Sequence, residues 1–356
     1  MAVRGAALQH QLRELVLSII PPLSVTNHKG QMGRVAVVGG SKEYTGAPYY
    51  AAISALKLGA DLSFVFCTEN AAVPIKTYSP ELIVIPMLDS DSAMDVMKSH
   101  WLPRLHVLVV GPGLGLDQQV RDVSYNIVKE AIDRSLPLVV DADGLGLLID
   151  RPDMLDCCST AILTPNIAEF KRLCKSRLDK DVSEYSDLAA AVLALAKTLA
   201  NVTVVLKGPV DIISDGEKVL TCDVPGTLRR CGGQGDVLSG SMATWLHWSH
   251  LSVTGASTGP PTGSTEAAIS HTKAATAILG SATTGSRPTV ASSGQMSSGQ
   301  YHMGRTLLQH YGPVVSAAYA ACSFTRMCAH LAFDTHGRTM TTPNIIESFA
   351  NAMATL

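Results

Sequence analysis

The chain of 356 residues is 46% hydrophobic and 16% charged, a balance that supplies apolar material for a sizeable core and excludes a disordered chain. Its 28 Lys and Arg residues nearly balance 30 Asp and Glu residues, and no basic stripe with interleaved aromatic residues occurs, so we expect a small-molecule ligand and no nucleic-acid partner. No apolar run approaches the ~20 residues that span a bilayer, and we expect no membrane partner.

The first residues, "MAVRGAALQHQLRELVLSII", predict an amphipathic helix that packs on the domain. Apolar residues recur at helical spacing, from Leu8 through Leu12 and Leu15 to Ile19. A transit peptide is the alternative interpretation and would imply mitochondrial import, but Glu14 argues against it. The eight cysteines show no zinc spacing and are interpreted as reduced core thiols. We therefore expect a cytoplasmic protein.

Short, β-branched apolar runs then alternate with helix-length segments. The runs are "RVAVVGG", "DLSFVFC", "LIVIPM", "HVLVVGPG", "PLVVDADG", "AILTPN" and "VTVVLKG". Continuous apolar runs are typical of parallel strands that are covered on both faces. The segments Pro48 to Leu58, Gln118 to Arg134 and Ser186 to Leu199 have the length and composition of crossover helices. The pattern predicts an α/β fold: one domain over residues 1–356, a three-layer αβα sandwich with a mostly parallel central sheet.

In such a sheet, ligands bind beyond the carboxyl ends of the strands. "VVGPGLG" places Gly113 and Gly115 after one strand, which we interpret as a tight loop that lines a ligand, because Pro112 spoils the match to a dinucleotide-binding G-x-G-x-x-G. "VVDADGLGLL" places Asp141 and Asp143 after another strand. One of these carboxylates can contact a ligand while the other caps a helix.

Next in the chain is "LTPNIAEFKRL", in which Asn166 and Glu169 are three residues apart and share one face of a helix. An Asn with a Glu is a plausible direct or water-mediated hold on Mg²⁺. The other interpretation is purely structural: an N-cap Asn with a Glu in the first turn. The residues alone leave both open.

"VVLKGPVDIISDG" places Lys207 and Gly208 at the end of a further strand. A lysine there can reach nucleotide phosphates, and a glycine lets them approach. Asp211 either hydrogen-bonds a nucleotide or closes a turn.

The densest motif is "CGGQGDVLSG". Gly232, Gly233 and Gly235 allow a backbone that aims successive N–H groups at one point, and the helix that follows has an electropositive N-terminus. This combination predicts an anion hole. Asp236, within it, is equally consistent with a helix N-cap and with a catalytic base beside a bound phosphate.

Residues 251–312 change in composition to Ser, Thr, Gly and Pro. Such a segment cannot bury enough apolar surface to offset its ordering entropy, so we expect a mostly disordered insertion with a short helix over residues 267–279. The core resumes with the helical run "VVSAAYAACSFTRMCAHLAF" and a last helix that has Pro343 in its first turn.

In this order and spacing the motifs resemble the ribokinase-like superfamily, in which a G-x-G-D loop forms the anion hole and an N-x-x-E motif organises Mg²⁺. The resemblance is closer to the ATP-dependent (S)-NAD(P)H-hydrate dehydratases and covers the whole chain except the insertion. It rests on "KGQMGRVAVVGGSKEYTGAPYYAAISALKLGADL", "GPGLG", "VDADGL", "TPNIAEFKRL", "LKGPVD", "GTLRRCGGQGDVLSG" and "TRMCAHLAFDTHGRTMTTPNII".

This resemblance implies a lyase in metabolite repair. Such enzymes return the S epimer of hydrated NADH or NADPH to the intact cofactor and hydrolyse ATP to ADP, with Mg²⁺. They act alongside an epimerase, and the resemblance also implies a homo-oligomer. The alternatives are a small-molecule kinase of the same fold, acting on a hydroxymethylpyrimidine, pyridoxal or sugar hydroxyl, and a non-catalytic nucleotide-binding protein.

The resemblance also implies roles for individual residues. Asp236 would be the catalytic base. The hydrated dinucleotide would contact Asp236 together with Gly113, Gly115, Asn166, Ile167, Ala168, Glu169, Phe170, Lys171 and Arg172. ATP would bind to Lys207, Gly208, Pro209, Val210, Asp211, Gly226, Thr227, Leu228, Arg229, Arg230, Cys231, Gly232, Gly233, Gln234 and Gly235. Asn166 and Glu169 are the metal-ligand candidates.

Overall fold

The computed structural model describes residues 2–155, 158–254 and 298–356. Within them, nine strands form one sheet in the order β3-β2-β1-β4-β5-β6-β7-β8-β9. The strands are β1 (Arg34–Val38), β2 (Leu62–Cys67), β3 (Ile83–Pro86), β4 (Val107–Val110), β5 (Leu138–Val140), β6 (Ala161–Leu163), β7 (Thr203–Leu206), β8 (Asp211–Ser214) and β9 (Val219–Cys222).

The seven predicted strands are β1 to β7, and they pair with one another in parallel. The pairs β7–β8 and β8–β9 are antiparallel. This hairpin strip at one edge was not predicted from the sequence, because only the Ile212–Ile213 pair in β8 is strongly apolar. The sheet is therefore mixed but mostly parallel, as expected.

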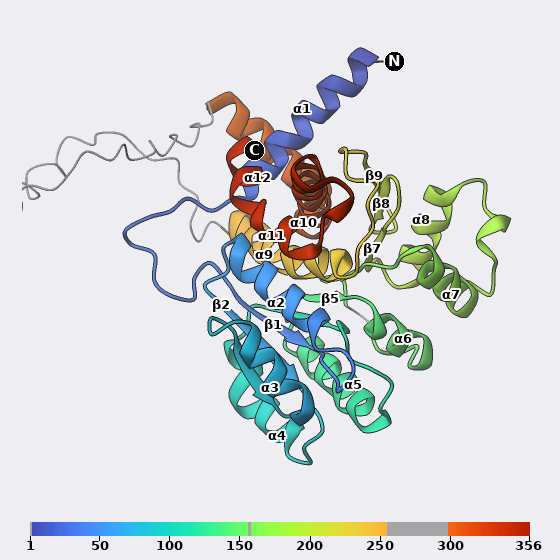
Figure 1. The fold of residues 1–356 in the computed structure, drawn as a ribbon. Coiled ribbons are helices and arrows are strands. Elements are labelled where there is room, and N and C mark those ends of the chain that lie inside the picture. The colour runs from blue at the N-terminus through green and yellow to red at the C-terminus, as the bar shows by residue number, and fades with distance from the viewer. Residues whose placement is uncertain (1, 156–157, 255–297) are drawn as a thin grey trace, which may run out of the picture.

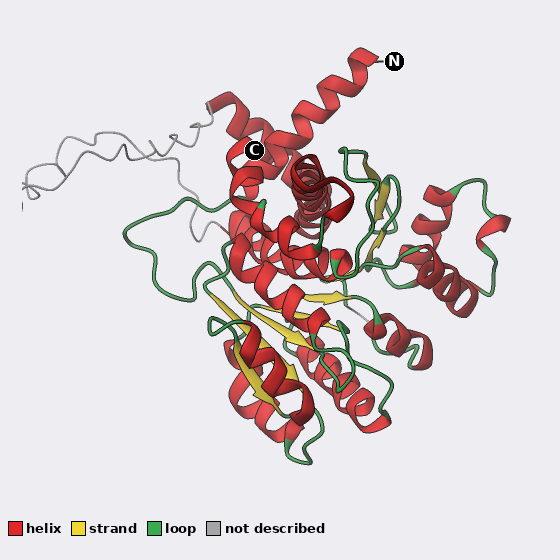
Figure 2. Cartoon of the chain, viewed as in Figure 1, coloured by secondary structure: helices red, strands yellow, loops and turns green. Residues whose placement is uncertain are grey.

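Helices cover both faces of the sheet (Figures 1 and 2). They are α1 (Ala2–Ile19), α2 (Gly46–Leu58), α3 (Glu69–Tyr78), α4 (Ala93–Val96), α5 (Gln118–Asp133), α6 (Asp143–Asp150), α7 (Ile167–Leu178), α8 (Leu188–Thr198), α9 (Gln234–Thr254), α10 (Ser298–His336), α11 (Thr342–Glu347) and α12 (Phe349–Thr355). Short 3-10 or π turns lie at Met97–Trp101, Leu102–Arg104, Val182–Glu184 and Gly337–Thr339. None of the described helices has the length and apolarity to cross a bilayer.

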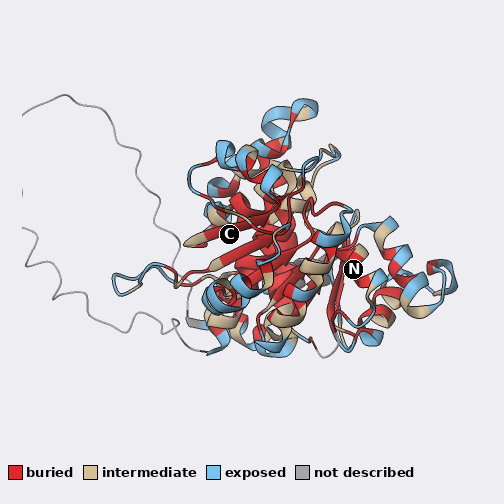
Figure 3. Cartoon of the chain, turned by 90° about the horizontal axis from the view of Figure 1, so that it is seen from below, coloured by how far each residue is buried: buried red, intermediate tan, exposed pale blue. Residues whose placement is uncertain are grey.

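Two apolar clusters, one on each side of the sheet, form the core. Alternate residues of a strand point to opposite sides, so Val35 and Val37 of β1 enter the cluster under α1, α2, α3, α9 and α10. Ala36 and Val38 enter the other cluster, under α5, α6, α7 and α8. Buried residues accordingly fill the middle of the molecule, and exposed ones lie on the outer helix surfaces and loop tips (Figure 3). The predicted three-layer architecture is confirmed.

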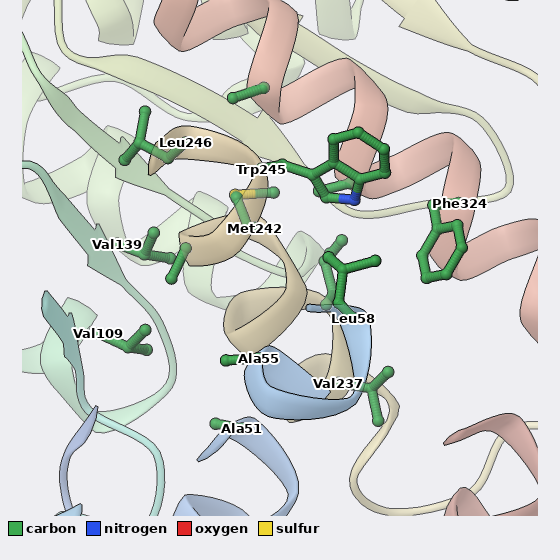
Figure 4. Packing of buried hydrophobic residues seen from close by; sticks show 14 of the residues in the cluster. Ala51, Ala55, Leu58, Val109, Val139, Val237, Met242, Trp245, Leu246 and Phe324 are labelled. Carbon is green, nitrogen blue, oxygen red and sulfur yellow. The ribbon is translucent and has the colours of Figure 1, made fainter. Parts of the chain in front are cut away.

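Helix α9 lies at the centre of the first cluster. Its Met242 and Trp245 lie between strand residues such as Val139 and the helices α2 and α10 (Figure 4). A Cβ added to Gly240 would lie 1.9 Å from the carbonyl oxygen of Ala51, so only glycine lets α2 approach this closely. The packing places the N-terminus of α9 at a fixed point beside α2.

The predicted N-terminal helix is α1, and its Leu12, Leu15 and Ile19 are buried in the core. The predicted insertion over residues 251–312 was wrong at both ends. Residues 251–254 continue α9, and residues 298–312 form the first part of α10, which is kinked at Gly312 and packs against α1. The helix expected over residues 267–279 lies outside the described residues. Pro343 lies in the first turn of α11, as predicted.

Candidate active site

The loops that follow the parallel strands meet at the carboxyl edge of the sheet. Backbone hydrogen bonds join them: the Gly40 N–H donates to the Gly113 carbonyl over 3.0 Å, and the Lys207 N–H donates to the Pro165 carbonyl over 2.9 Å. These bonds link the ends of β1, β4, β6 and β7. The edge is thus a connected surface on which the predicted site residues are brought together.

The loop 232–235 leads into α9 and has the form of an anion site. Gly233 has a φ of +93°, and a Cβ there would lie 2.8 Å from Tyr50 Cδ2, so only glycine fits on both counts. The Thr342 hydroxyl, at the start of α11, donates to the Gly232 carbonyl over 2.5 Å. The first N–H groups of a helix have no partner within it. At α9 they follow a loop that lies against α2 and α11, an arrangement suited to phosphate.

A buried ion pair lies beside this loop. Lys207 Nζ donates to Asp141 Oδ1 over 2.8 Å, and Asp141 is 2% exposed. A Cβ on Gly235 would be 3.4 Å from Lys207 Nζ, which places the ammonium group against the anion loop. Burial pulls the pKa of Lys207 down, but Asp141, Glu169 and Asp236 outweigh it, so the pKa is raised and the lysine stays charged.

Asp236 faces the same pair. It is the third residue of α9 and therefore lies inside the first turn, not at the N-cap. Within the described residues its carboxylate makes no hydrogen bond beyond its own backbone amide. Burial first, and then Asp141, raise the pKa of Asp236 to about 8, against the lowering effect of Lys207. A general base is most effective when its pKa lies near the working pH, and the raised pKa of Asp236 brings it into that range.

The two aspartates after β5 have different partners. Asp143 Oδ2 accepts the Gly115 N–H over 2.9 Å and so braces the loop after β4. Asp141 holds Lys207. Ala142 between them has a φ of +48°, a backbone conformation that costs energy in a non-glycine residue. With this conformation between them, Asp141 binds Lys207 and Asp143 binds the Gly115 N–H. The sequence analysis expected one of these two carboxylates to contact a ligand and left open which; it did not foresee that Asp141 pairs with Lys207.

Asn166 and Glu169 form a capping box on α7. Asn166 Oδ1 accepts the N–H groups of Ala168 and Glu169 over 2.9 and 3.0 Å, and Glu169 Oε2 accepts the Asn166 N–H over 2.8 Å. The structural interpretation of this pair therefore holds. Among the described residues no group of three or more His, Cys, Asp or Glu side chains could hold a metal ion. Glu169 Oε1 accepts no hydrogen bond within the same part of the chain, so one oxygen remains for a metal that arrives with phosphates.

Asp211 closes a turn, the second of its two predicted alternatives. Its Oδ1 accepts the Gly208 N–H over 2.9 Å, and its Oδ2 accepts a hydrogen bond from Arg326 Nε of α10 over 2.7 Å. Arg326 also donates to the carbonyls of Gly208, Pro209 and Val224. The side chain of Asp211 thus holds the loop after β7. The sequence analysis gave Arg326 no role: it lies in the quoted run "TRMCAHLAFDTHGRTMTTPNII", but nothing near it in the sequence indicates that its partner is Asp211.

Phe170 is another correction. Its side chain is fully buried in the second core cluster and cannot line a ligand. Its neighbours Ile167, Lys171 and Arg172 are exposed. Of the ATP-loop candidates only Asp211 is buried; the others are exposed or half-buried, namely Lys207, Gly208, Pro209, Val210, Gly226, Thr227, Leu228, Arg229, Arg230, Cys231, Gly232, Gly233, Gln234 and Gly235.

The chain is similar to proteins of known family. A family model described as NAD(P)H-hydrate dehydratase matches residues 35–295. The ATP-dependent (S)-NAD(P)H-hydrate dehydratase of Homo sapiens is 45% identical over 343 residues, which cover 96% of this chain and 84% of that protein.

Two crystal structures share the fold. One is a ribokinase-like superfamily protein from Enterococcus faecalis, with a TM-score of 0.66 and 18% identity over 96% of this chain and 94% of that one. The other is an ADP/ATP-dependent NAD(P)H-hydrate dehydratase from Bacillus subtilis, co-crystallised with ATP and Mg²⁺, with a TM-score of 0.61 and 18% identity over 95% of this chain and 96% of that one. These likenesses show the ribokinase-like fold.

Proposed function

The chain belongs to the NAD(P)H-hydrate dehydratase family, and we propose on that premise that it dehydrates the S epimer of hydrated NADH or NADPH with the use of ATP. The protein is then a hydro-lyase that repairs nicotinamide cofactors. The observation that carries the proposal is the placement of Asp236, with its raised pKa, between the anion loop and the Lys207–Asp141 pair. A proton acceptor beside a phosphate cradle serves phosphoryl transfer to a hydroxyl group.

The chemistry explains why a dehydratase needs such a cradle. Hydration has added water across a double bond of the nicotinamide ring, and the hydroxyl that results is a poor leaving group. The carboxylate of Asp236 takes the hydroxyl proton as the oxygen attacks the γ-phosphorus of ATP, and ADP leaves. The C–O bond of the phosphoester then breaks, phosphate departs, and loss of the neighbouring ring proton restores the double bond. The products are NAD(P)H, ADP and phosphate.

The two nucleotides have separate surfaces in this proposal. The N–H groups of residues 233–235 and the ammonium of Lys207 bind the phosphates of ATP and offset the charge that develops during transfer. The loops 207–211 and 226–231 hold the rest of ATP, and Arg326 keeps the first of them in shape. Gly113, Gly115 and the exposed residues of the first turns of α7 line the dinucleotide.

We propose that Mg²⁺ enters with ATP. Glu169, through its uncommitted Oε1 and next to Asn166, would hold the ion directly or through water. The ion would supply positive charge against the phosphates. Asn166, whose Oδ1 already caps α7, would contribute only through water.

Three wider features belong to the same proposal. An epimerase supplies the S epimer, because a stereospecific site leaves the other epimer unrepaired. The protein forms a homo-oligomer, which is supported by Leu23 and Val25, 94% and 104% exposed on the loop before β1. It acts in the cytoplasm, which is supported by the burial of Leu15 and Ile19 of α1 in the core. Light scattering tests the homo-oligomer. Fractionation of cells tests the cytoplasmic location, to which mitochondrial import is the alternative.

Absorbance tests the reaction itself. Purified protein is incubated with ATP, Mg²⁺ and S-hydrated NADH, and we expect the absorbance band of reduced nicotinamide to return with one ADP and one phosphate formed per NADH. Parallel incubations replace ATP by ADP or the S epimer by the R epimer. If the absorbance band returns in none of these incubations and the protein phosphorylates hydroxymethylpyrimidine, pyridoxal or a sugar, it is instead a kinase of the same fold.

A further inference from the structure

A depression of about 390 Å³ lies between the start of α7 and the segment that leads into α8, on the green helices of Figure 1. Two aliphatic side chains line it and remain open to solvent: Ile167 is 44% exposed and Leu188 is 40% exposed. The ring of Tyr185 completes the apolar lining, and Lys180 Nζ lies 5.6 Å from the centre of that ring. An exposed apolar lining with one aromatic ring is suited to a flat heterocycle.

The charged side chains that line the depression differ in how many hydrogen bonds they make to the protein. Asp187 Oδ1 caps α8 by accepting the Ala190 N–H over 2.8 Å. Asp181 accepts hydrogen bonds from Ser183, and these bonds, with the cations of Lys171 and Lys175 nearby, lower the pKa of Asp181. Lys171 makes no hydrogen bond or ion pair within the described part of the chain. It is also the one cation among the described residues that line the depression, and so the group there that is suited to a phosphate.

The depression adjoins the active site without sharing its ATP loops. Helix α7 begins at the carboxyl edge of the sheet, and Glu169 of its first turn is near enough to Lys207 to raise the pKa of that lysine. Ile167 and Lys171 belong to the same first two turns. None of the residues that line the depression comes from the loops 207–211 or 226–235. A ligand seated here thus leaves the loops proposed for ATP free.

We propose that this depression binds the adenosine end of the hydrated dinucleotide, with the adenine against Ile167, Leu188 and Tyr185 and a phosphate on Lys171. The proposal rests on the proposed function and deepens it. A volume of about 390 Å³ is at the lower end of the ~300–1,000 Å³ usual for ligand pockets, which suits one nucleoside and not a whole dinucleotide. The nicotinamide end then lies at Asp236.

The test compares Lys171→Ala with Lys175→Ala, a matched control one helical turn further on. Lys175 is also exposed but is paired with Asp179 over 3.0 Å and does not line the depression. We expect Lys171→Ala to raise the KM for hydrated NADH or NADPH about tenfold or more, as for one charged hydrogen bond, with kcat and the KM for ATP unchanged. Lys175→Ala should leave all three at wild-type values.

A truncated substrate sharpens the comparison. The hydrate of reduced nicotinamide mononucleotide lacks the adenosine end, so Lys171→Ala should turn it over with the same kcat/KM as the wild type. A larger effect on hydrated NADPH than on hydrated NADH would assign Lys171 to the 2′-phosphate, and equal effects would assign it to the phosphate on the adenosine side of the pyrophosphate.

Three outcomes overturn the proposal: an unchanged KM for both dinucleotides, an equal loss on the truncated substrate, or a rise confined to the KM for ATP. Each of them leaves the repair reaction of the wild type intact. Absence of that reaction in the wild type would instead overturn the proposed function.

Discussion

At the scale of single residues, the proposed reaction depends on Asp236 and the charged side chains around it. Four charged side chains that are far apart in the sequence, Asp141, Glu169, Lys207 and Asp236, act on one another at the carboxyl edge of the sheet. Three of them are acidic and one is basic, so the site carries negative charge that favours retention of a proton by Asp236. Burial is the first cause of the raised pKa of Asp236, and the negative charge of Asp141 adds to it.

Replacement of this carboxylate separates catalysis from binding. We expect Asp236→Asn to lower kcat at least about 100-fold, the lower end for a general base, with the affinity for ATP measured by calorimetry largely unchanged. Folding raises the pKa of Asp236 from 3.8 to about 8. Between these two values the unfolded chain has lost the proton that the folded protein keeps, so the free energy of unfolding falls as pH rises towards 8. The variant should therefore melt no lower than the wild type at pH 8. Normal turnover by Asp236→Asn would reduce Asp236 to a structural residue.

The same pKa sets a pH profile. Because the base must be ionised, kcat/KM should rise about tenfold per pH unit below the pKa of the free enzyme and level off above it, and that pKa is about 8. Asp141→Asn removes a negative charge that raises the pKa of Asp236 and frees Lys207, which lowers it. The rising part of the pH profile should therefore shift to lower pH. Rates measured across pH 5.5 to about 9.5 with both proteins check this. An identical rising part in the variant would contradict the role of Asp141.

At the scale of elements, long-range contacts hold the loops that carry the site. Helix α10 reaches the loop after β7 through Arg326, and α11 reaches the anion loop through Thr342. Neither loop is braced by its own strand or helix alone. The helices that close the chain after residue 298 therefore take part in shaping a site whose chemistry lies before residue 237.

Loss of the Arg326 contact should show this coupling. Arg326→Met keeps the apolar stem but leaves Asp211, which is 6% exposed, without its cation, and removal of one partner of a buried pair costs about 3 kcal/mol or more. We expect the free energy of unfolding in urea to fall by that amount and the KM for ATP to rise. Adding Asp211→Asn to the variant should recover part of the stability, because it removes the unpaired charge. No recovery would argue against the ion pair as the cause.

At the scale of the whole molecule, the edge opposite the site holds a cluster of histidines. The rings of His106, which precedes β4, and His247 of α9 stack with their centres 4.5 Å apart. Burial, then His247 and Arg34, lower the pKa of His106 to about 4, although Asp61 acts in the other direction. Burial likewise lowers the pKa of His247 and of His250. The stacked rings of His106 and His247 join α9 to the start of the sheet.

Acid should therefore loosen this edge. A histidine whose folded pKa is depressed stabilises the protein above its unfolded pKa of 6.5 and loses that contribution as pH falls towards 4. His106→Asn keeps an acceptor for the Arg34 N–H and should shrink the difference in unfolding free energy between pH 7.5 and 5 by about 1 kcal/mol. Urea titrations at both pH values measure it, with the exposed His336→Asn as control. A difference as large as that of the wild type would locate the acid sensitivity elsewhere.

The sequence by itself determined the layers of the fold and the motifs of the site. Continuous apolar runs specify strands buried on both faces, and the glycines before α9 specify a loop that other residues cannot adopt; both are local properties that neighbouring residues encode. The helical spacing of Phe170, Leu173 and Cys174 also marked a buried face, and attention to it would have removed Phe170 from the substrate-binding residues.

Only the tertiary structure decided which of two local meanings each polar residue has. Asp141 and Lys207 are 66 positions apart in the sequence, and their pairing depends on the sheet order, which long-range burial selects. The same holds for Asp211, whose partner Arg326 follows 115 residues later, and for Asp236, which became a strong candidate base and not a cap once α9 was seen to begin before it. A carboxylate has the same chemistry everywhere in a chain, and its pKa and partners are set by what folding places around it.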